Sequence, residues 1–300
     1  MGNSQGSVIE NVDVPYGSDE AHHMDFYHGA ESSSNSRRAP LLVFIHGGAW
    51  RTGSRKDHIK MARSLAAQSG AVVAVIDYRL TLPTADSSAS SSNEHVEFTN
   101  RHPAHIEDVY AALRFLLLPN NGGKTAAERF GYDPSNAFLM GHSVGAWMAA
   151  AVLLDPCRAP RKGSGQVWPR LCQNDGQARD LRRRIKAYLL VDGIYSLPSL
   201  LDEYPDYRSF VAQAFPLEED QYGVEQEQLA SASVETWPYA PDGEDAAHSE
   251  RIKVGIYHSL DDELLSTRQS DEALEYLKRT CPSRAQVFDV RAHWVSRSGF

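Results

Sequence analysis

The sequence contains few of the features that mark several large classes of protein. Its three cysteines, Cys157, Cys172 and Cys281, are widely spaced in 300 residues and lack metal-ligand spacing, which suits a reducing compartment. It has no apolar run of about 18 residues, as a transmembrane helix needs. The first residues lack both the apolar stretch of a signal peptide and the Ser or Thr that favours myristoylation. We therefore expect a soluble, cytoplasmic protein.

Positive charge is also scarce. The formal net charge is −9, and the only locally basic segment is 179–186, which we interpret as a solvated approach to a strand at 187–192. A charge of this sign argues against binding to nucleic acid or to an anionic membrane surface. The hydrophobic content of 42% is enough to fill a core, so we expect a single domain over residues 1–300.

The most informative stretch that is present is Gly141-His-Ser-Val-Gly145. It follows a strand-like run at 136–140 and precedes a helix-like run at 146–154. A turn this tight around a strained serine needs neighbours the size of glycine. The pattern predicts a nucleophile elbow with Ser143 as the nucleophile; the alternative is an ordinary strand-to-helix turn with an exposed serine.

A second motif stands where a predicted central strand, 41–45, ends. Its residues are His46, Gly47, Gly48, Ala49 and Trp50. Two successive glycines let backbone N–H groups point at a reacting oxygen. We predict an oxyanion hole formed by the N–H groups of Gly48, Ala49 and Val144, and we interpret His46 as a residue that fixes the loop. A narrow acyl pocket beside Ala49 and Trp50 is a further hypothesis.

The acid of a triad is expected after the serine, at the end of a strand. The strand pattern at 252–257 runs into Asp261, Asp262 and Glu263, of which we choose Asp262. The alternative is that these carboxylates only complement the N-terminal dipole of a helix at 266–278.

The predicted base is His293, which is the only histidine after the next strand pattern, 286–290. One ring nitrogen would take the proton of Ser143, and the other would donate to Asp262. On position alone, a histidine so near the end of the sequence reads as a surface residue.

Strand and helix patterns alternate along the chain, which is typical of an α/β fold with a mostly parallel sheet flanked by helices. Antiparallel edge strands are expected within 8–28. Other expected elements are helices at 56–69 and 103–118, a buried strand at 71–77 and a turn at 131–135. The serine-rich segment 81–101 predicts a mobile loop, or alternatively a lid.

Two segments between core elements, 155–180 and 196–250, predict excursions over the active site. These segments contain more Pro, aromatic and acidic residues than strands tolerate. Five aromatic residues are candidates to stack on an aryl ring, or alternatively to pack in the core: Tyr195, Tyr204, Tyr207, Phe210 and Phe215.

Together, His46 to Trp50, Gly141 to Ala146 and His258 to Leu265 resemble the arylformamidases, or kynurenine formamidases, most closely their fungal branch. These are esterase/lipase-like α/β-hydrolases. The family motif H-G-G-x-W is matched at His46 to Trp50, and its acid, which stands directly before Glu-Leu-Leu, is matched by Asp262. The resemblance spans most of residues 41–293.

The resemblance implies hydrolysis of N-formyl-L-kynurenine to L-kynurenine and formate in tryptophan catabolism, without a cofactor or metal, by an enzyme that is a homodimer. The sequence departs from the family after the last strand, because similar proteins continue for a helix or more beyond the histidine. The alternative to His293 as the base is that the native end is lost and His293 stands at this position by coincidence. The alternatives are a small-ester carboxylesterase of the same fold and a non-catalytic binding protein.

Overall fold

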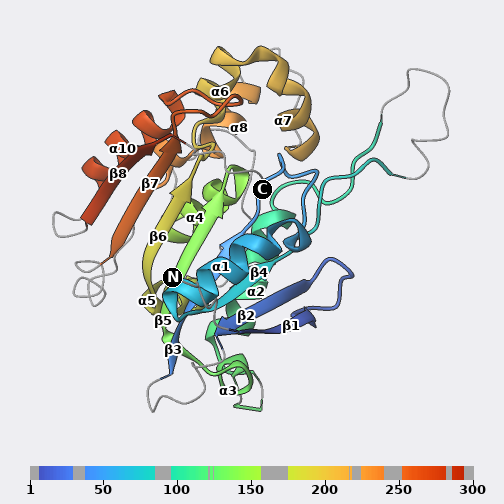
Figure 1. Cartoon of the computed structure of the whole chain (residues 1–300). Helices are drawn as coiled ribbons and strands as arrows, with labels where there is room; N and C mark the ends of the chain where they lie inside the picture. Colours follow the sequence, from blue (N-terminus) through green and yellow to red (C-terminus); the bar gives the residue numbers. More distant parts are fainter. Residues whose placement is uncertain are drawn as a thin grey trace.

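The computed structural model describes residues 7–29, 38–84, 96–120, 122–123, 125–156, 175–215, 217, 224–239, 252–281 and 286–293. Within them, eight strands form one sheet in the order β1-β2-β4-β3-β5-β6-β7-β8 (Figure 1). The strands are β1 (Val8–Pro15), β2 (His23–Gly29), β3 (Ala39–Ile45), β4 (Val72–Ile76), β5 (Tyr132–His142), β6 (Ile185–Val191), β7 (Lys253–Ser259) and β8 (Gln286–Ala292).

Strands β3 to β8 run parallel, whereas β1 and β2 are antiparallel at one edge, as predicted for residues 8–28. All five residues of β4 are buried. Burial on both faces is what a continuous run of Val, Ala and Ile predicts for a strand inside a parallel sheet. The predicted α/β-hydrolase fold, with a mostly parallel sheet flanked by helices, is confirmed.

The helices follow the strands in the alternating order that the sequence predicts. Those before β6 are η2 (Arg55–His58), α1 (Ile59–Ser69), α2 (Ala104–Leu117), α3 (Ala126–Phe130), α4 (Val144–Leu153) and α5 (Asp175–Arg184). The later ones are α6 (Leu197–Glu203), η6 (Pro205–Tyr207), α7 (Arg208–Ala214), α8 (Val224–Ser231), η7 (Val234–Thr236) and α10 (Arg268–Thr280). Helices α6 to α8 lie at the top of the molecule in Figure 1, past the arrowhead of β5, and we call the described residues from α6 to η7 the cap.

Two hydrophobic clusters hold the layers together. The smaller joins α1 to β2, β3 and β4 and includes Tyr27, Phe44 and Ala62. The larger contains every residue of α4 except Gly145, and all residues of this helix are buried. An all-apolar helix such as Ala146 to Leu153 is stable only when it is enclosed on all sides, so α4 fixes the position of the turn that precedes it.

One local prediction is wrong. Residues 132–135, expected in a turn, begin β5, because Tyr132 is buried and pairs with Ala39 of β3. The basic segment 179–186, expected to be a solvated approach to a strand, is mostly the end of α5, which leads directly into β6. The three arginines in its last turn favour a helix C-terminus, where the backbone dipole is negative, and Leu181 is buried.

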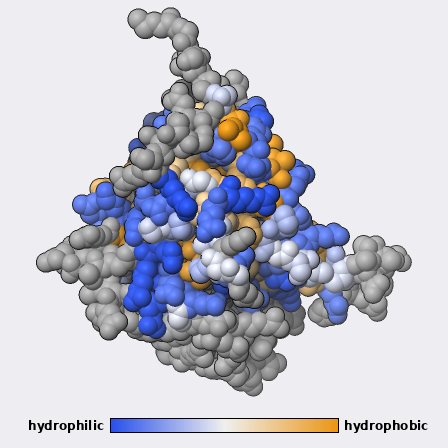
Figure 2. All heavy atoms as spheres, turned by 90° about the horizontal axis from the view of Figure 1, so that it is seen from below, coloured by the Kyte–Doolittle hydropathy of each residue, from blue (hydrophilic) through white to orange (hydrophobic). Residues whose placement is uncertain are grey.

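Parts of the predicted excursions and of the serine-rich loop, residues 87–92 included, lie outside the described residues. The described ends of that loop meet in an antiparallel bridge between Pro83 and Phe98. Seen from below, most of the described surface is hydrophilic, with apolar residues in small groups (Figure 2). No helix of the described chain combines the length and apolarity that a membrane crossing requires.

Candidate active site

The predicted site residues lie at one edge of the sheet, because β3, β5, β6, β7 and β8 are parallel and all end there. Ile45 on β3 is opposite Gly141 on β5, so the oxyanion loop and the elbow leave the sheet side by side. The loop with Asp262 follows β7, and His293 follows β8. The carboxyl edge of such a sheet is where ligands bind in open α/β folds.

The turn at Ser143 has the predicted strained geometry. Its φ of 54° and ψ of −121° fall outside the regions that side chains prefer. A Cβ atom on Gly141 would lie 2.1 Å from the carbonyl oxygen of Gly145, and one on Gly145 would lie 2.2 Å from that of Ile45. Only glycine fits at either position, so the backbone itself presents the Ser143 hydroxyl, which has no hydrogen-bond partner in the described chain.

The oxyanion loop packs directly on this turn. A Cβ atom on Gly47 would lie 2.9 Å from Cβ of Ser143. Gly48 has a φ of +104°, and Ala49 and Trp50 also have positive φ values, 52° and 60°. Three such residues in a row turn the backbone sharply, at a cost of about 1–3 kcal/mol for each non-glycine residue.

The three N–H groups predicted to form the oxyanion hole are those of Gly48, Ala49 and Val144. None of them donates to a carbonyl or side chain of the described chain. Val144 is the first residue of α4, where backbone N–H groups have no acceptor within the helix. The structure therefore leaves these donors available to a ligand beside Ser143.

Behind the loop, His46 and Tyr78 hold it in place. The two rings stack with centroids 4.3 Å apart. Tyr78 donates its hydroxyl to the carbonyl oxygens of His46 and Gly47, at 3.2 and 3.1 Å. Nδ1 of His46 lies 2.7 Å from the Gly47 carbonyl oxygen and Nε2 lies 3.7 Å from Asp77. Burial lowers the pKa of His46, which favours the neutral ring and supports its interpretation as a loop-fixing residue.

Trp50 lies in the core and has no exposed surface. Its ring meets those of Trp147 and Phe215 edge to face, at 5.6 and 5.1 Å. Truncating Trp50 would therefore remove core packing as well as any restriction on the acyl group.

The acid loop after β7, which contains Asp262, lies beside a second acidic residue, Asp192. Oδ1 of Asp262 accepts hydrogen bonds from the N–H groups of Leu264 and Leu265, at 2.8 and 3.1 Å. Asp192, at the end of β6, is buried and accepts one from Ser259 at 2.6 Å. Burial raises the pKa of Asp192, and the charge of Asp262 adds to the increase. We did not identify Asp192 from the sequence, although its place after a buried strand was a usable signal.

Asp192, His258 and Asp262 each offer a ligand atom within 4.8 Å of the others. However, Nδ1 of His258 lies 2.9 Å from the hydroxyl of Ser270, and its Nε2 lies 3.3 Å from the carbonyl oxygen of Leu265. Both ring nitrogens thus have partners within the protein, and the arrangement does not favour a metal ion.

His293 does not reach Ser143 in this structure. Its Nδ1 lies 2.9 Å from Oδ1 of Asp261, and 72% of its side chain is exposed. Strand β8 is three positions from β5, which corresponds to about 14 Å between strand axes. His293 contacts Asp261 and not Asp262, to which the predicted hydrogen bond was assigned. Asp262 is turned toward the N–H groups of its own loop, whereas Asp261 faces the end of β8.

The aromatic candidates divide into two groups. Tyr195, Phe210 and Phe215 are buried in the core, which is the alternative that the sequence left open. Tyr204 and Tyr207 are only partly buried and stack on each other, with centroids 5.0 Å apart. These two rings are available to a ligand.

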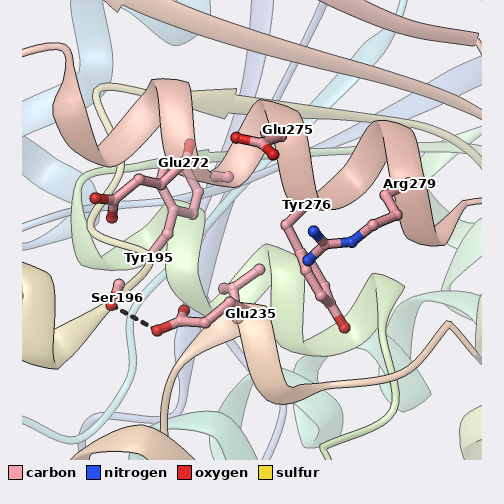
Figure 3. Close-up of a pocket in the computed structure, with 9 residues that line it drawn as sticks. Tyr195, Ser196, Glu235, Glu272, Glu275, Tyr276 and Arg279 are labelled. Atoms are coloured by element: carbon pink, nitrogen blue, oxygen red, sulfur yellow. Dashed lines mark hydrogen bonds between the residues drawn. The ribbon is translucent and has the colours of Figure 1, made fainter.

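A cavity of about 220 Å³ between α10 and the cap does not include the predicted site (Figure 3). Among its residues, Ser196 donates a hydrogen bond to Glu235 at 2.6 Å, and Glu272 and Arg279 extend from α10. None of the predicted catalytic or oxyanion residues lines this cavity.

Comparisons with known proteins show which proteins this chain is similar to. The sequence family described as BD-FAE matches residues 24–155. Kynurenine formamidase from Saccharomyces cerevisiae is 30% identical, over 80% of this chain and 76% of that protein. The enzyme of that name from Meyerozyma guilliermondii is 27% identical, over 93% and 86%. Esterase B from Lactobacillus rhamnosis, 18% identical, superposes with a TM-score of 0.61 over 95% of this chain and 76% of that one, which shows the fold.

Proposed function

The chain belongs to the kynurenine formamidase family of α/β-hydrolases, and we propose that it hydrolyses N-formyl-L-kynurenine to L-kynurenine and formate in tryptophan catabolism. The observation that carries the proposal is the strained Ser143 turn beside three N–H groups that have no acceptor among the described residues. Several relatives named kynurenine formamidase match most of the chain, which supports this substrate over others.

In the proposed reaction, the hydroxyl oxygen of Ser143 attacks the formyl carbon and loses its proton to a base. The charge that develops on the formyl oxygen is stabilised by the N–H groups of Gly48, Ala49 and Val144; removing one such donor typically costs about 3–4 kcal/mol. The protonated base then gives its proton to the nitrogen of the arylamine as the C–N bond breaks. The base then takes a proton from water, and the water oxygen attacks the carbonyl carbon of the formyl-enzyme. The bond to Ser143 breaks, the base returns a proton to the Ser143 oxygen, and formate is released.

We propose His293 as the base and Asp262 as the acid that orients it. In the structure the His293 ring contacts Asp261. Catalysis therefore requires the end of β8 to shift, so that this ring moves past the ends of β7 and β6 toward Ser143. Catalytic hydrogen bonds are often long or absent without substrate. Loss of all but residual turnover in a His293→Ala variant would support the assignment.

One assay tests the function. Purified protein is given N-formyl-L-kynurenine and, separately, a short p-nitrophenyl ester. We expect N-formyl-L-kynurenine to be hydrolysed faster than the ester. The kynurenine that forms is measured by its absorbance. Turnover of the ester alone would favour a carboxylesterase, which the similarity to solved esterases makes the second candidate. Turnover of neither would favour a non-catalytic binding protein.

We also propose a single domain, a cytoplasmic location and a homodimer. The single continuous sheet supports one domain. Light scattering of the purified protein would measure its mass in solution, and a monomer would contradict the dimer.

A further inference from the structure

A row of four neighbouring aromatic rings links the oxyanion loop to the acid loop. Its members are Tyr204, Tyr207, Phe210 and Trp50, and we name it the aromatic row. Centroids of successive rings are 5.0, 5.2 and 6.2 Å apart. Near the Tyr204 end of the row, Tyr207 donates its hydroxyl to the carbonyl oxygen of Leu264 in the acid loop, at 2.8 Å. At the other end, Trp50 is part of the oxyanion loop.

The strand order places this row over Ser143. The oxyanion loop follows β3 and the acid loop follows β7, and between these strands lie only β5 and β6. A row that joins the two loops therefore crosses the end of β5, where the elbow lies. Figure 1 agrees, because α6 and α7, which bracket η6, lie beyond the ends of these strands. The row is thus one wall of the space above Ser143.

Arg51 occupies the oxyanion-loop end of this wall. Its guanidinium lies over the ring of Phe210, 5.6 Å from the centroid, and donates to the side chain of Gln213 at 3.3 Å. The side chain is exposed, and within the described chain it has no carboxylate partner. A cation on an aromatic face keeps its N–H groups free for an anion.

Arg101, also at this end of the described molecule, uses its guanidinium to donate to the backbone carbonyl oxygens of Ala212, Gln213 and Phe215. Three further arginines there pair with acids. Arg208 pairs with Glu225, and Arg291 pairs with Asp271 and Asp289. Arg268 likewise pairs with Asp202 and Glu272. The opposite end of the wall is acidic, since Asp261 and Asp262 lie next to Leu264. An anionic group of a ligand is therefore repelled from the acid loop and attracted to Arg51.

We infer that Arg51 binds the α-carboxylate of the amino-acid substrate, while the partly exposed rings of the aromatic row, Tyr204 and Tyr207, lie against its aryl ring. This inference rests on the proposed function, because only a substrate with a carboxylate has use for such a cation. The guanidinium fork suits a carboxylate with two parallel hydrogen bonds. Arg51 thereby selects arylformamides that carry an α-carboxylate over those that lack one.

The test compares N-formyl-L-kynurenine with N-formylkynuramine, which lacks only the carboxylate. We expect Arg51→Met to raise KM for N-formyl-L-kynurenine by about 10- to 100-fold, the range for a lost hydrogen bond to a charged group. The KM for N-formylkynuramine should change by less than about threefold. Arg51→Lys should lie between wild type and Arg51→Met, because it keeps the charge without the fork.

Arg129 provides a matched control. Its guanidinium also lies over a phenylalanine ring, that of Phe130, at 4.8 Å. It stands on α3, at the opposite end of the molecule in Figure 1, so Arg129→Met should leave both KM values unchanged.

Equal effects of Arg51→Met on both formamides, or no effect on either, would overturn the inference while leaving the proposed function intact. If wild type cleaves the ester but neither formamide, the proposed function fails. The carboxylate site is then judged by competitive inhibition of the ester reaction: L-kynurenine should inhibit wild type more strongly than kynuramine, and Arg51→Met should abolish the difference. Equal inhibition by the two amines would overturn it.

Discussion

The nucleophile half of the site and its acid–base half are built in different ways. Around Ser143, backbone atoms of β3, β5 and α4 touch directly, and Gly141 and Gly145 leave room only for hydrogen. Around Asp261 and His293, exposed side chains make the contacts, and 72% of the His293 side chain is exposed. The first half is fixed by the fold, whereas His293 in the second half is held by one exposed contact with Asp261.

This difference teaches which part of the reaction the fold sets in advance. Exposed ion pairs contribute about 0–1 kcal/mol and are easily replaced. The oxyanion donors, in contrast, need no rearrangement to meet a substrate. We conclude that the charge-stabilising half is preformed and that the proton-transferring half must be assembled.

The largest expected effect tests whether the two halves act as one unit. Ser143→Ala should lower kcat for N-formyl-L-kynurenine by up to about 10⁶-fold, as loss of a triad nucleophile does. If His293 is the base, His293→Ala should match that loss, because triad members act together. Turnover by His293→Ala within about threefold of wild type would remove His293 from the mechanism.

The next test separates the two neighbouring acids. Asp262→Asn should lower kcat by about 10⁴-fold, because an asparagine holds the imidazole in the wrong tautomer. Asp261→Asn removes only an exposed pair and should cost less than about tenfold. Steady-state kinetics of the two variants decide the question, and the reverse order would make Asp261 the acid.

A smaller loss is expected from disturbing the preformed half. Gly48→Ala places a Cβ atom 2.0 Å from the carbonyl oxygen of Thr52, so the loop must shift its N–H groups. We expect kcat to fall by about 10²- to 10³-fold. Gly70→Ala is the control: its φ is +67°, but no atom lies within 4 Å of its Cβ position. Gly70→Ala should lower the stability of the fold and leave kcat unchanged. Equal losses of kcat in both variants would contradict this account.

The smallest expected effect is on the pH dependence of stability. Burial lowers the pKa of His58, beneath the oxyanion loop, to about 4. The unfolded chain, with a histidine pKa of about 6.5, then binds more protons than the folded one, so stability falls as pH drops from about 6.5 to 4. Thermal unfolding at pH 7 and pH 5 measures this. A His58→Gln variant should lose less of its melting temperature over that interval, and an equal loss would contradict the prediction.

The preformed half could be predicted from the sequence because its signals are local. Tight backbone approach demands glycine, and Gly47, Gly48, Gly141 and Gly145 occur next to strand and helix patterns that place them. The same local logic predicted all eight strands, and it was wrong where a pattern was weak, at residues 132–135.

The acid–base half was harder to predict because it depends on contacts between distant segments. Nothing local to Asp261 or Asp262 indicates which of them faces His293, 31 to 32 residues later. Tyr78 and Asp192 were missed for the same reason: their roles arise from partners on other strands, His46 for Tyr78 and Ser259 for Asp192.

The glycine contacts at the elbow also shape how this protein can change. A side chain at Gly145 would strike the Ile45 carbonyl oxygen and one at Gly141 would strike that of Gly145, and backbone atoms offer no smaller substitute. In a library of random substitutions, these two glycines would be as intolerant as Ser143 itself, although neither takes part in bond breaking. New specificities are therefore accessible through the cap and Arg51, where side chains meet side chains, far more readily than through the turn that carries the nucleophile.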